Sequence, residues 1–413
     1  MWLNLIKEFL QDLRKQKLRT SLTIIAITWG TIAVVTLLAF GEGLGVQLIQ
    51  GMRGGGNQAM IFYGGQTSRT FDGLDIGRRI RFDENDVTML QRSVPQIEII
   101  SPQYGRYVNL RVGSNGTNTF MEGVDAGFDE MRSMYPVAGG RFLNSRDVAE
   151  QRRVAFIGHE LADQLFTDGQ AVGQSMQIDD SPFTIVGVMS EKMQMGMSNG
   201  PDSRRVVIPY TTYRQMFSQQ HLNSMVIRPS NPAYQQEVES SVREIMGRKY
   251  KFHADDSQAV HVWDFIEAER IMSQVNMGMK IFLFTVGFFT LLIAGVGVAN
   301  IMYVVVKERT REIGIKKAIG AKNSHIVSQF IFEALFICLI GGTIGLIFSA
   351  SLILGVQALQ IEGDVADFLI NPVLSLDAMA MTTGVLTLIG LAAGIFPARK
   401  ATLVDPVESL RYE

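Results

Sequence analysis

The sequence predicts a membrane protein with four transmembrane α-helices and a large α+β extracytoplasmic domain. Three observations support this prediction. Four apolar runs with at most one charge each are long enough to cross a bilayer as helices, and Lys and Arg cluster beside them on one predicted side. The long stretch between the first two runs mixes strand and helix signals. The runs span residues 20–41, 281–306, 326–361 and 378–398.

Residues 1–19 are predicted to form an amphipathic helix on the inner membrane surface, because apolar and basic residues alternate there at helical spacing. The competing interpretation is a secretory signal peptide, since a basic region precedes the apolar run at 20–41. That run is long, however, and ends in Gly-Glu-Gly-Leu-Gly without a small-x-small cleavage site. We therefore expect a cytoplasmic start and a first span that ends at Gly41.

Residues 42–280 form the predicted extracytoplasmic domain, in which one order of elements occurs twice. Each copy is a strand, a helix and a second strand. The first copy is expected at 59–63, 83–94 and 97–101, and the second at 225–228, 232–247 and 250–253. The two copies bracket a strand-rich middle piece at about 107–220.

The middle piece carries the signal of a β-hairpin, with Gly113-Ser114-Asn115-Gly116 as its turn. The other elements expected there are strands at 107–112, 117–124, 153–157 and 183–189 and helices at 160–166 and 211–217. A final helix from Val262 is expected to continue through Lys280 into the second span. Such a stalk would connect the outer domain to the membrane helix.

The second span leads directly into a charged segment, residues 307–325, which the positive-inside rule places in the cytoplasm. Opposite charges and isoleucines recur there at helical spacing. The pairs are Glu308 with Arg311, Glu312 with Lys316, and Ile315 with Ile319. This predicts a short helix that stops at Gly320, before Asn323 or Ser324 caps the next. Its isoleucines either rest against the membrane or, as we favour, dock into a cytoplasmic partner.

The last two spans flank an acidic loop at 362–377 that has no Lys or Arg, as expected outside, and Arg399-Lys400 opens a cytoplasmic tail at 399–413. Small residues in the spans allow close helix packing or a dimer seam. They are Gly295, Gly297, Ala299, Gly341, Gly345, Gly390 and Gly394. Glu333 lies inside the third span, and we expect it to pair with a Lys or Arg of the charged segment as a structural acid rather than to relay protons.

Several kinds of chemistry are not expected. No G-x-x-x-x-G-K-[ST] motif occurs, so ATP binding of the Walker type is not predicted in this chain. The histidines are scattered, the one cysteine is Cys338, and no catalytic constellation or metal site can be argued. A net charge of −2 does not indicate nucleic-acid binding.

A methionine cluster in the outer domain is compatible with Cu(I) binding, because thioethers suit soft metals. Its members are Met189, Met193, Met195 and Met197, with Glu191 among them. Without a nearby Cys or paired His, an apolar contact surface or loose core packing is favoured.

Several short strings carry a family resemblance. Residues 307–314 read Lys-Glu-Arg-Thr-Arg-Glu-Ile-Gly, residues 317–321 read Lys-Ala-Ile-Gly-Ala, and the chain ends in Leu-Arg-Tyr-Glu. These resemble the MacB/FtsX-type permeases, also called type VII or mechanotransmission ABC transporters. Met-Glu-Gly-Val-Asp at 121–125 and Ala-Gly-Gly-Arg-Phe at 138–142 resemble the periplasmic domain of MacB-type permeases.

The resemblance implies that the two strand-helix-strand halves form a porter-like subdomain, and that residues 281–406 form an FtsX-like permease domain. It further implies that residues 307–325 hold a coupling helix that sits in a groove of an ATPase subunit. By resemblance, the residues expected at that contact are Glu308, Arg309, Arg311, Glu312, Ile315 and Ile319.

By the same resemblance, the chain is expected to be a non-catalytic permease subunit in the bacterial inner membrane. It would form a homodimer, or a paired heterodimer, with a separate MacB-like ATPase that carries ATP and Mg²⁺. The first hypothesis is efflux of a peptide, antibiotic or similar amphiphile, with a periplasmic adaptor and an outer-membrane exit duct. The alternatives are a lipoprotein-releasing permease of the LolC/LolE kind and an FtsX-like regulator of a cell-wall hydrolase.

Overall fold

The computed structural model describes residues 17–166, 170–196, 199–359 and 371–402. The chain divides into two units, Met1–Val46 with Gln274–Glu413 and Gln47–Ser273. Helices α2 (Lys17–Gly55) and α9 (Phe265–Glu308) each contribute residues to both units. Three expected segments lie wholly or largely outside the described residues: the amphipathic helix at 1–19, the loop at 362–377 and the tail at 399–413.

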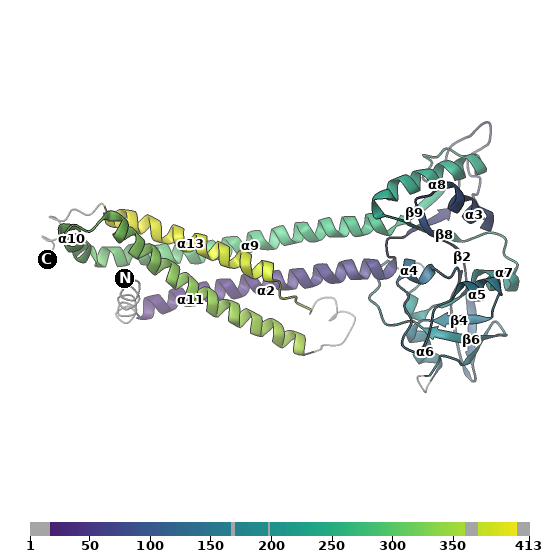
Figure 1. The fold of residues 1–413 in the computed structure, drawn as a ribbon, viewed down its shortest axis with the longest axis horizontal. Helices are drawn as coiled ribbons and strands as arrows, with labels where there is room; N and C mark the ends of the chain where they lie inside the picture. The colour runs from purple at the N-terminus through teal and green to yellow at the C-terminus, as the bar shows by residue number, and fades with distance from the viewer. Residues whose placement is uncertain (1–16, 167–169, 197–198, 360–370, 403–413) are drawn as a thin grey trace. The chain divides into compact units, whose positions relative to one another are not determined.

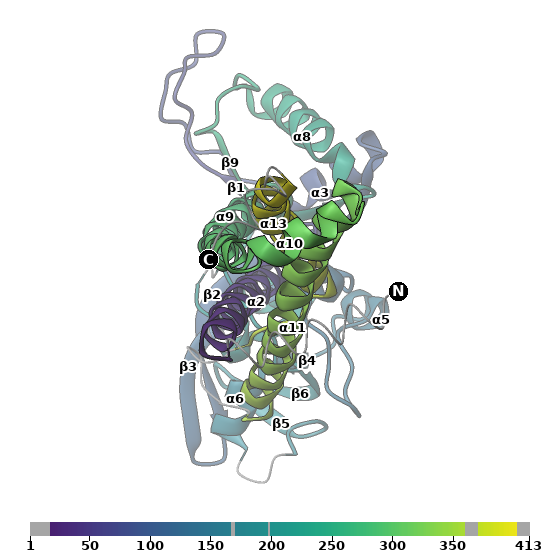
Figure 2. The same ribbon diagram turned by 90° about the vertical axis from the view of Figure 1, so that its left-hand side faces the viewer.

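The first unit is helical. Besides its parts of α2 and α9, it contains α10 (Thr310–Ala318), α11 (Asn323–Ala358) and α13 (Leu376–Thr402). The helices α2, α9, α11 and α13 are long and apolar enough to cross a membrane, as predicted. Helices α11 and α13 lie side by side, with α10 beside the same end of both (Figure 1), and α10 lies in front of them in the end-on view (Figure 2). Each of these four helices contributes to one apolar core that includes Ile27, Leu291, Ile337 and Leu386.

Helix α2 does not end at Gly41, as the sequence had indicated, but continues to Gly55. Glycine lowers helix propensity, yet it also lets neighbouring groups approach the helix closely. A Cβ atom at Gly43 would overlap the carbonyl oxygen of Asn371, and one at Gly45 would overlap the side chain of Asn276. These glycines therefore serve packing rather than helix termination.

The second unit contains a nine-stranded sheet with the order β3-β7-β4-β6-β5-β2-β8-β1-β9. The strands are β1 (Met60–Gly64), β2 (Ile97–Val112), β3 (Asn115–Val124), β4 (Val154–Ile157), β5 (Ser175–Ile178), β6 (Ser181–Val188), β7 (Val206–Pro209), β8 (Ser224–Pro229) and β9 (Val260–Asp264). The helices are α3 (Glu84–Ser93), α4 (Phe128–Arg132), α5 (Ser145–Ala149), α6 (His159–Leu165), η1 (Asp202–Arg204), α7 (Tyr210–Phe217), η2 (Pro232–Tyr234) and α8 (Gln235–Tyr250).

The two predicted strand-helix-strand units are present and interleaved. The units β1–α3–β2 and β8–α8–β9 form one antiparallel arrangement with the order β2-β8-β1-β9, so each unit places a strand between the two strands of the other. This is the split βαβ pattern. Asp83 caps α3 through a capping box, as its position before the helix had indicated.

The inserted subdomain begins inside strand β2. Residues 97–103 of β2 pair with β8, whereas residues 104–112 pair with β3. The predicted strands at 97–101 and 107–112 are therefore one continuous strand that belongs to both subdomains. The hairpin to β3 turns at Gly113, whose φ is +57°. Strands β5 and β7 carried no clear sequence signal.

Two further predicted boundaries, both in the second unit, are wrong. Residues 250–253 are not a strand, because α8 continues to Tyr250 and the strand that follows is β9. The alternation of Tyr250 and Phe252 instead reflects two rings that pack on the core around the helix end. The stalk helix does not begin at Val262, which pairs with Phe62 in the sheet, but at Phe265. Asp264 accepts hydrogen bonds from the backbone of Ile266 and Glu267 and so caps α9.

Candidate functional site

The charged segment after the second span folds as a separate short helix. Helix α9 ends at Glu308, Arg309 occupies the N-cap position of α10, and Gly320 follows α10 with a φ of +91°. The expected stop at Gly320 is therefore present. Glu308 and Arg311 do not share one continuous helix, however, because the helix break lies between them. Neither Asn323 nor Ser324 caps α11, since its N-cap residue is Lys322.

One ion pair joins the start of α10 to the third long helix. Arg309 Nη1 lies 2.9 Å from Glu333 Oε1, and both side chains are largely buried. The Gln329 amide lies 3.4 Å from the same oxygen, and Lys316 donates to Gln329 at 3.2 Å. Glu333, which lies in the third apolar span, thus pairs with an arginine of the charged segment. This is the kind of partner that the sequence had indicated.

The other contacts of this segment reach two more helices. Glu308, at the end of α9, lies 3.4 Å from Arg19 of α2. The Lys317 ammonium donates to the carbonyl of Thr402 in α13 at 2.8 Å. Helix α10 and its flanks are therefore bonded to the described parts of α2, α11 and α13.

The isoleucines of α10 and of its C-cap position divide between core and surface. Ile313 is buried in the helical core, whereas Ile315 is 44% and Ile319 is 80% exposed. Arg311 and Glu312 are also exposed. Apolar side chains between exposed charges can fill a groove of a protein partner.

Most of the small residues picked out in the spans lie against another helix of the same chain. A Cβ atom would meet Ile27 at Gly341, Thr31 at Gly345, Cys338 at Gly390 and Ile331 at Gly394. Gly295 faces Ile389, and Ala299 packs at the edge of the core. Gly297 has no atom within 4 Å of a built Cβ, so its face of α9 is open in the single chain.

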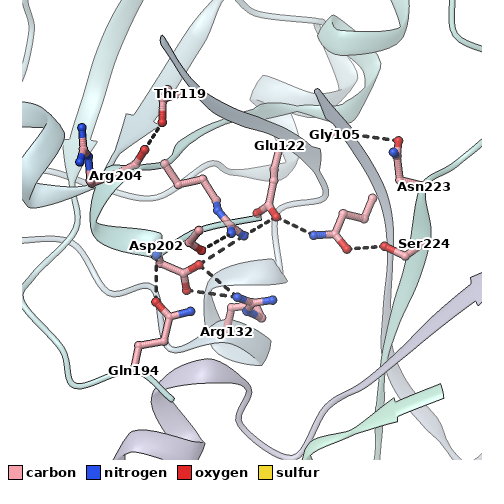
Figure 3. Close-up of polar contacts among 12 residues, drawn as sticks. Gly105, Thr119, Glu122, Arg132, Gln194, Asp202, Arg204, Asn223 and Ser224 are labelled. Carbon is pink, nitrogen blue, oxygen red and sulfur yellow. Dashed lines mark hydrogen bonds and ion pairs between the residues drawn. The ribbon is translucent and has the colours of Figure 1, made fainter. Parts of the chain in front are cut away.

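A second constellation lies in the second unit, Gln47–Ser273, which is called the outer unit below. Five charged side chains are largely buried together there, and Figure 3 shows Glu122, Arg132 and Asp202 among them. Arg132 lies 3.1 Å from Asp202, Arg205 pairs with Glu122 at 2.5 Å, and Asp202 accepts from Lys192 at 2.8 Å. The Gln103 amide donates to Glu122, which extends the network to strand β2.

The electrostatics of this network hold its carboxylate ionised. Burial by itself would raise the pKa of Asp202, but the positive charges of Arg132, Lys192 and Arg205 outweigh burial and hold that pKa well below its ordinary value. Burial lowers the pKa of Lys192, which its contact with Asp202 only partly offsets. Sequence analysis missed this network, because its members come from separate elements with no common spacing.

The methionine cluster does not form one exposed surface. Met189 is buried in the core, and Met193 and Met195 lie half-buried against the last turn of α2. Met197 lies outside the described residues. Among the residues that the structure describes, no group of three or more His, Cys, Asp or Glu side chains is placed to hold a metal ion.

Comparison with protein families gives two matches. Residues 20–245 match the MacB-like periplasmic core domain, and residues 284–403 match the FtsX-like permease C-terminal domain. The first match alone covers more than half of the chain.

Individual relatives point in the same direction. The chain is 28% identical to the macrolide export ATP-binding/permease protein MacB of Bdellovibrio bacteriovorus, over 98% of this chain and 61% of that protein. It is 32% identical to the pyoverdine export ATP-binding/permease protein PvdT of Pseudomonas fluorescens, over 96% and 57%. The chain thus spans about three fifths of the length of these relatives.

Among solved structures, the periplasmic region of MacB from Actinobacillus actinomycetemcomitans aligns with a TM-score of 0.43 and 16% identity. The alignment covers 55% of this chain and 97% of that one.

Proposed function

Because the chain belongs to the family of ABC transporter permeases with a MacB-like periplasmic core domain and an FtsX-like permease domain, we propose that it couples ATP hydrolysis by a separate ATPase subunit to conformational work outside the membrane. In this proposal α10 receives the movement of the ATPase, and α9 and α2 carry that movement to the outer unit. ATP and Mg²⁺ would bind to the ATPase.

The observation that carries the proposal is the arrangement of α10. It exposes Ile315 and Ile319 while Arg309, at its start, is bonded to Glu333 of α11. Exposed isoleucines supply contact area for a partner. The ion pair bonds the start of α10 directly to α11, so a displacement of α10 would also displace α11. A loop that only rested on the membrane surface would not need that connection.

The proposed path outward is a helix without interruption. Helix α9 runs from Phe265 to Glu308 and contains no proline. A continuous α-helix resists bending and stretching because each turn is hydrogen-bonded to the next, so displacement at one end can reach the other. The Arg53 guanidinium lies 2.6 Å from Glu269, which joins the outer part of α2 to α9.

Export is the transport direction that we propose. Similar proteins are named macrolide export and pyoverdine export ATP-binding/permease proteins, and both names describe export. We extend this to a peptide, an antibiotic or a similar amphiphile, exported with a periplasmic adaptor and an outer-membrane duct. A second copy of the chain and an inner-membrane location with cytoplasmic termini complete the proposal.

The test is to crosslink the full-length chain mildly in its native membrane and to identify the copurified proteins. We expect an ATPase together with an adaptor protein. Copurified outer-membrane lipoproteins in place of an adaptor would favour lipoprotein release, and a peptidoglycan hydrolase would favour regulation of cell-wall cleavage.

A substitution addresses the coupling site itself. Ile315→Asp should reduce ATPase recovery by about tenfold or more, since a charge replaces an apolar anchor. The matched control is Ile76→Asp, which makes the same substitution at another exposed isoleucine, in the outer unit. This variant should leave ATPase recovery unchanged. Equal ATPase recovery with Ile315→Asp and wild type would refute α10 as the docking element.

A further inference from the structure

The outer end of helix α2 is in direct backbone contact with residues 190–196, a segment that follows strand β6. Met195 N donates to the carbonyl of Gly51 at 2.7 Å. A Cβ atom at Gly54 would overlap the carbonyl oxygen of Met193, and one at Gly55 would overlap that of Met195. The last turn of α2 is therefore shaped, by the absence of side chains, to fit this segment.

Lys192 fastens the same contact from within the segment. Its ammonium lies 2.8 Å from the carbonyl of Gly54, 2.6 Å from that of Arg132 and 2.8 Å from the Asp202 carboxylate. These three groups come from α2, α4 and η1. A cation at the C-terminal end of a helix is also favoured by the helix dipole. One largely buried side chain thus bonds the end of α2 to two elements of the inserted subdomain.

From Asp202, which accepts from Lys192, the polar contacts continue into the sheet (Figure 3). Asp202 N donates to the Gln194 side chain at 2.9 Å, and Asp202 Oδ1 lies 3.3 Å from Arg205 Nη1. Arg205, in the loop after η1, pairs in turn with Glu122 of β3. The Gln103 amide donates to Glu122 at 2.8 Å, and Ser224 of β8 bonds the other end of that amide. An unbroken series of short contacts therefore joins the end of α2 to both subdomains.

Without bonds to the insertion, α2 would act on the outer unit mainly through its covalent link to strand β1, which belongs to the four-stranded part of the sheet. The insertion lies between β2 and β8 in the chain and is not joined to α2 by that link. Ser133 Oγ donates to the carbonyl of Arg53 at 3.1 Å, a further bond between α4 and the end of α2.

We propose that residues 190–196, held by Lys192, transmit displacement of α2 to the inserted subdomain, with Lys192 as a positioning residue. This rests on the proposed function, because it assumes that α2 moves during the ATPase cycle. The buried Asp202 and Arg132 hold Lys192 in place. The glycines of α2 allow the segment to pack directly against the helix, so that the two can move together.

The experiment uses the full-length chain with its copurified ATPase in nanodiscs. Hydrogen–deuterium exchange is measured with and without MgATP plus vanadate, for peptides of β1 and of β3. In wild type, both strands should change exchange with nucleotide. In Lys192→Met, the nucleotide-dependent change in β3 should be lost, while the change in β1 and the ATPase rate remain.

Gly54→Ala is the second variant, because it displaces the segment while leaving Lys192 intact, and the same loss in β3 is expected. Gly278→Ala is the matched control, since a Cβ there has no atom within 4 Å. A β3 response that persists in both Lys192→Met and Gly54→Ala overturns the inference. If Lys192→Met unfolds, Gly54→Ala decides the question. If wild type itself shows no nucleotide response or no ATPase, the proposed function fails instead.

Discussion

The two constellations of this protein differ in where their charges lie. Around α10 one largely buried ion pair, Arg309 with Glu333, supports a segment that exposes Ile315 and Ile319. In the outer unit, by contrast, Arg132, Asp202 and Arg205 are almost completely buried and bond only inside the chain. A surface that binds a partner must expose its contact groups, whereas charges that are buried inside one chain must be paired with each other. Substitutions should therefore affect partner binding at the first and folding at the second.

The largest effect on folding is expected from Asp202→Asn. This change leaves three buried cations facing the Glu122 carboxylate alone, and breaking a buried ion pair costs about 3–5 kcal/mol. Hydrogen exchange of β3 and β7 in the purified full chain should report this loss. The control is Asp255→Asn, whose pair with Arg69 is exposed, so a change below about 1 kcal/mol is expected. Equal effects of the two substitutions would remove the distinction between buried and exposed pairs.

Acid should weaken the same network more gradually. The pKa of Asp202 is lower in the folded chain than its ordinary value of 3.8, so the unfolded chain binds its proton first as the pH falls. The stabilisation by Asp202 is therefore complete above that ordinary value and declines as the pH falls below it toward the folded pKa. Exchange of β3, corrected for the intrinsic pH dependence, measures this decline. In Asp202→Asn the corresponding component should be absent.

The smallest folding effect of the three is expected at α10. Arg309→Glu places two acids together. It should lower the hydrogen-exchange protection of the α10 amides by about 2 kcal/mol, which is the typical contribution of a hydrogen bond to a charged group. Exchanging the charges, with Arg309→Glu and Glu333→Arg together, should recover at least part of that protection and of the ATPase rate in the complex. Arg19→Glu is the control, because its pair with Glu308 is exposed. A double variant as impaired as the single one would contradict a direct role of the pair.

Much of the architecture follows from local patterns. The four apolar runs, the two strand-helix-strand units and the hairpin at Gly113 each carry their signal within a few consecutive residues. The errors occur where distant contacts override such signals. Helix α2 passes through Gly41 because Asn371 and Asn276 pack against the glycines that follow it. Val262 is a strand residue because β1 is available to pair with it.

The sequence by itself determined the apolar spans, their basic flanks, the family and the isoleucine-bearing segment after the second span. Each of these features depends only on residues that are close together in the sequence. It also indicated that Glu333 needs a basic partner. Only the tertiary structure decided that the partner is Arg309, that Ile319 stays exposed, and that Lys192 meets Gly54 and Asp202. Contacts between residues so far apart in the chain depend on how helices and strands pack, and no local spacing encodes that packing.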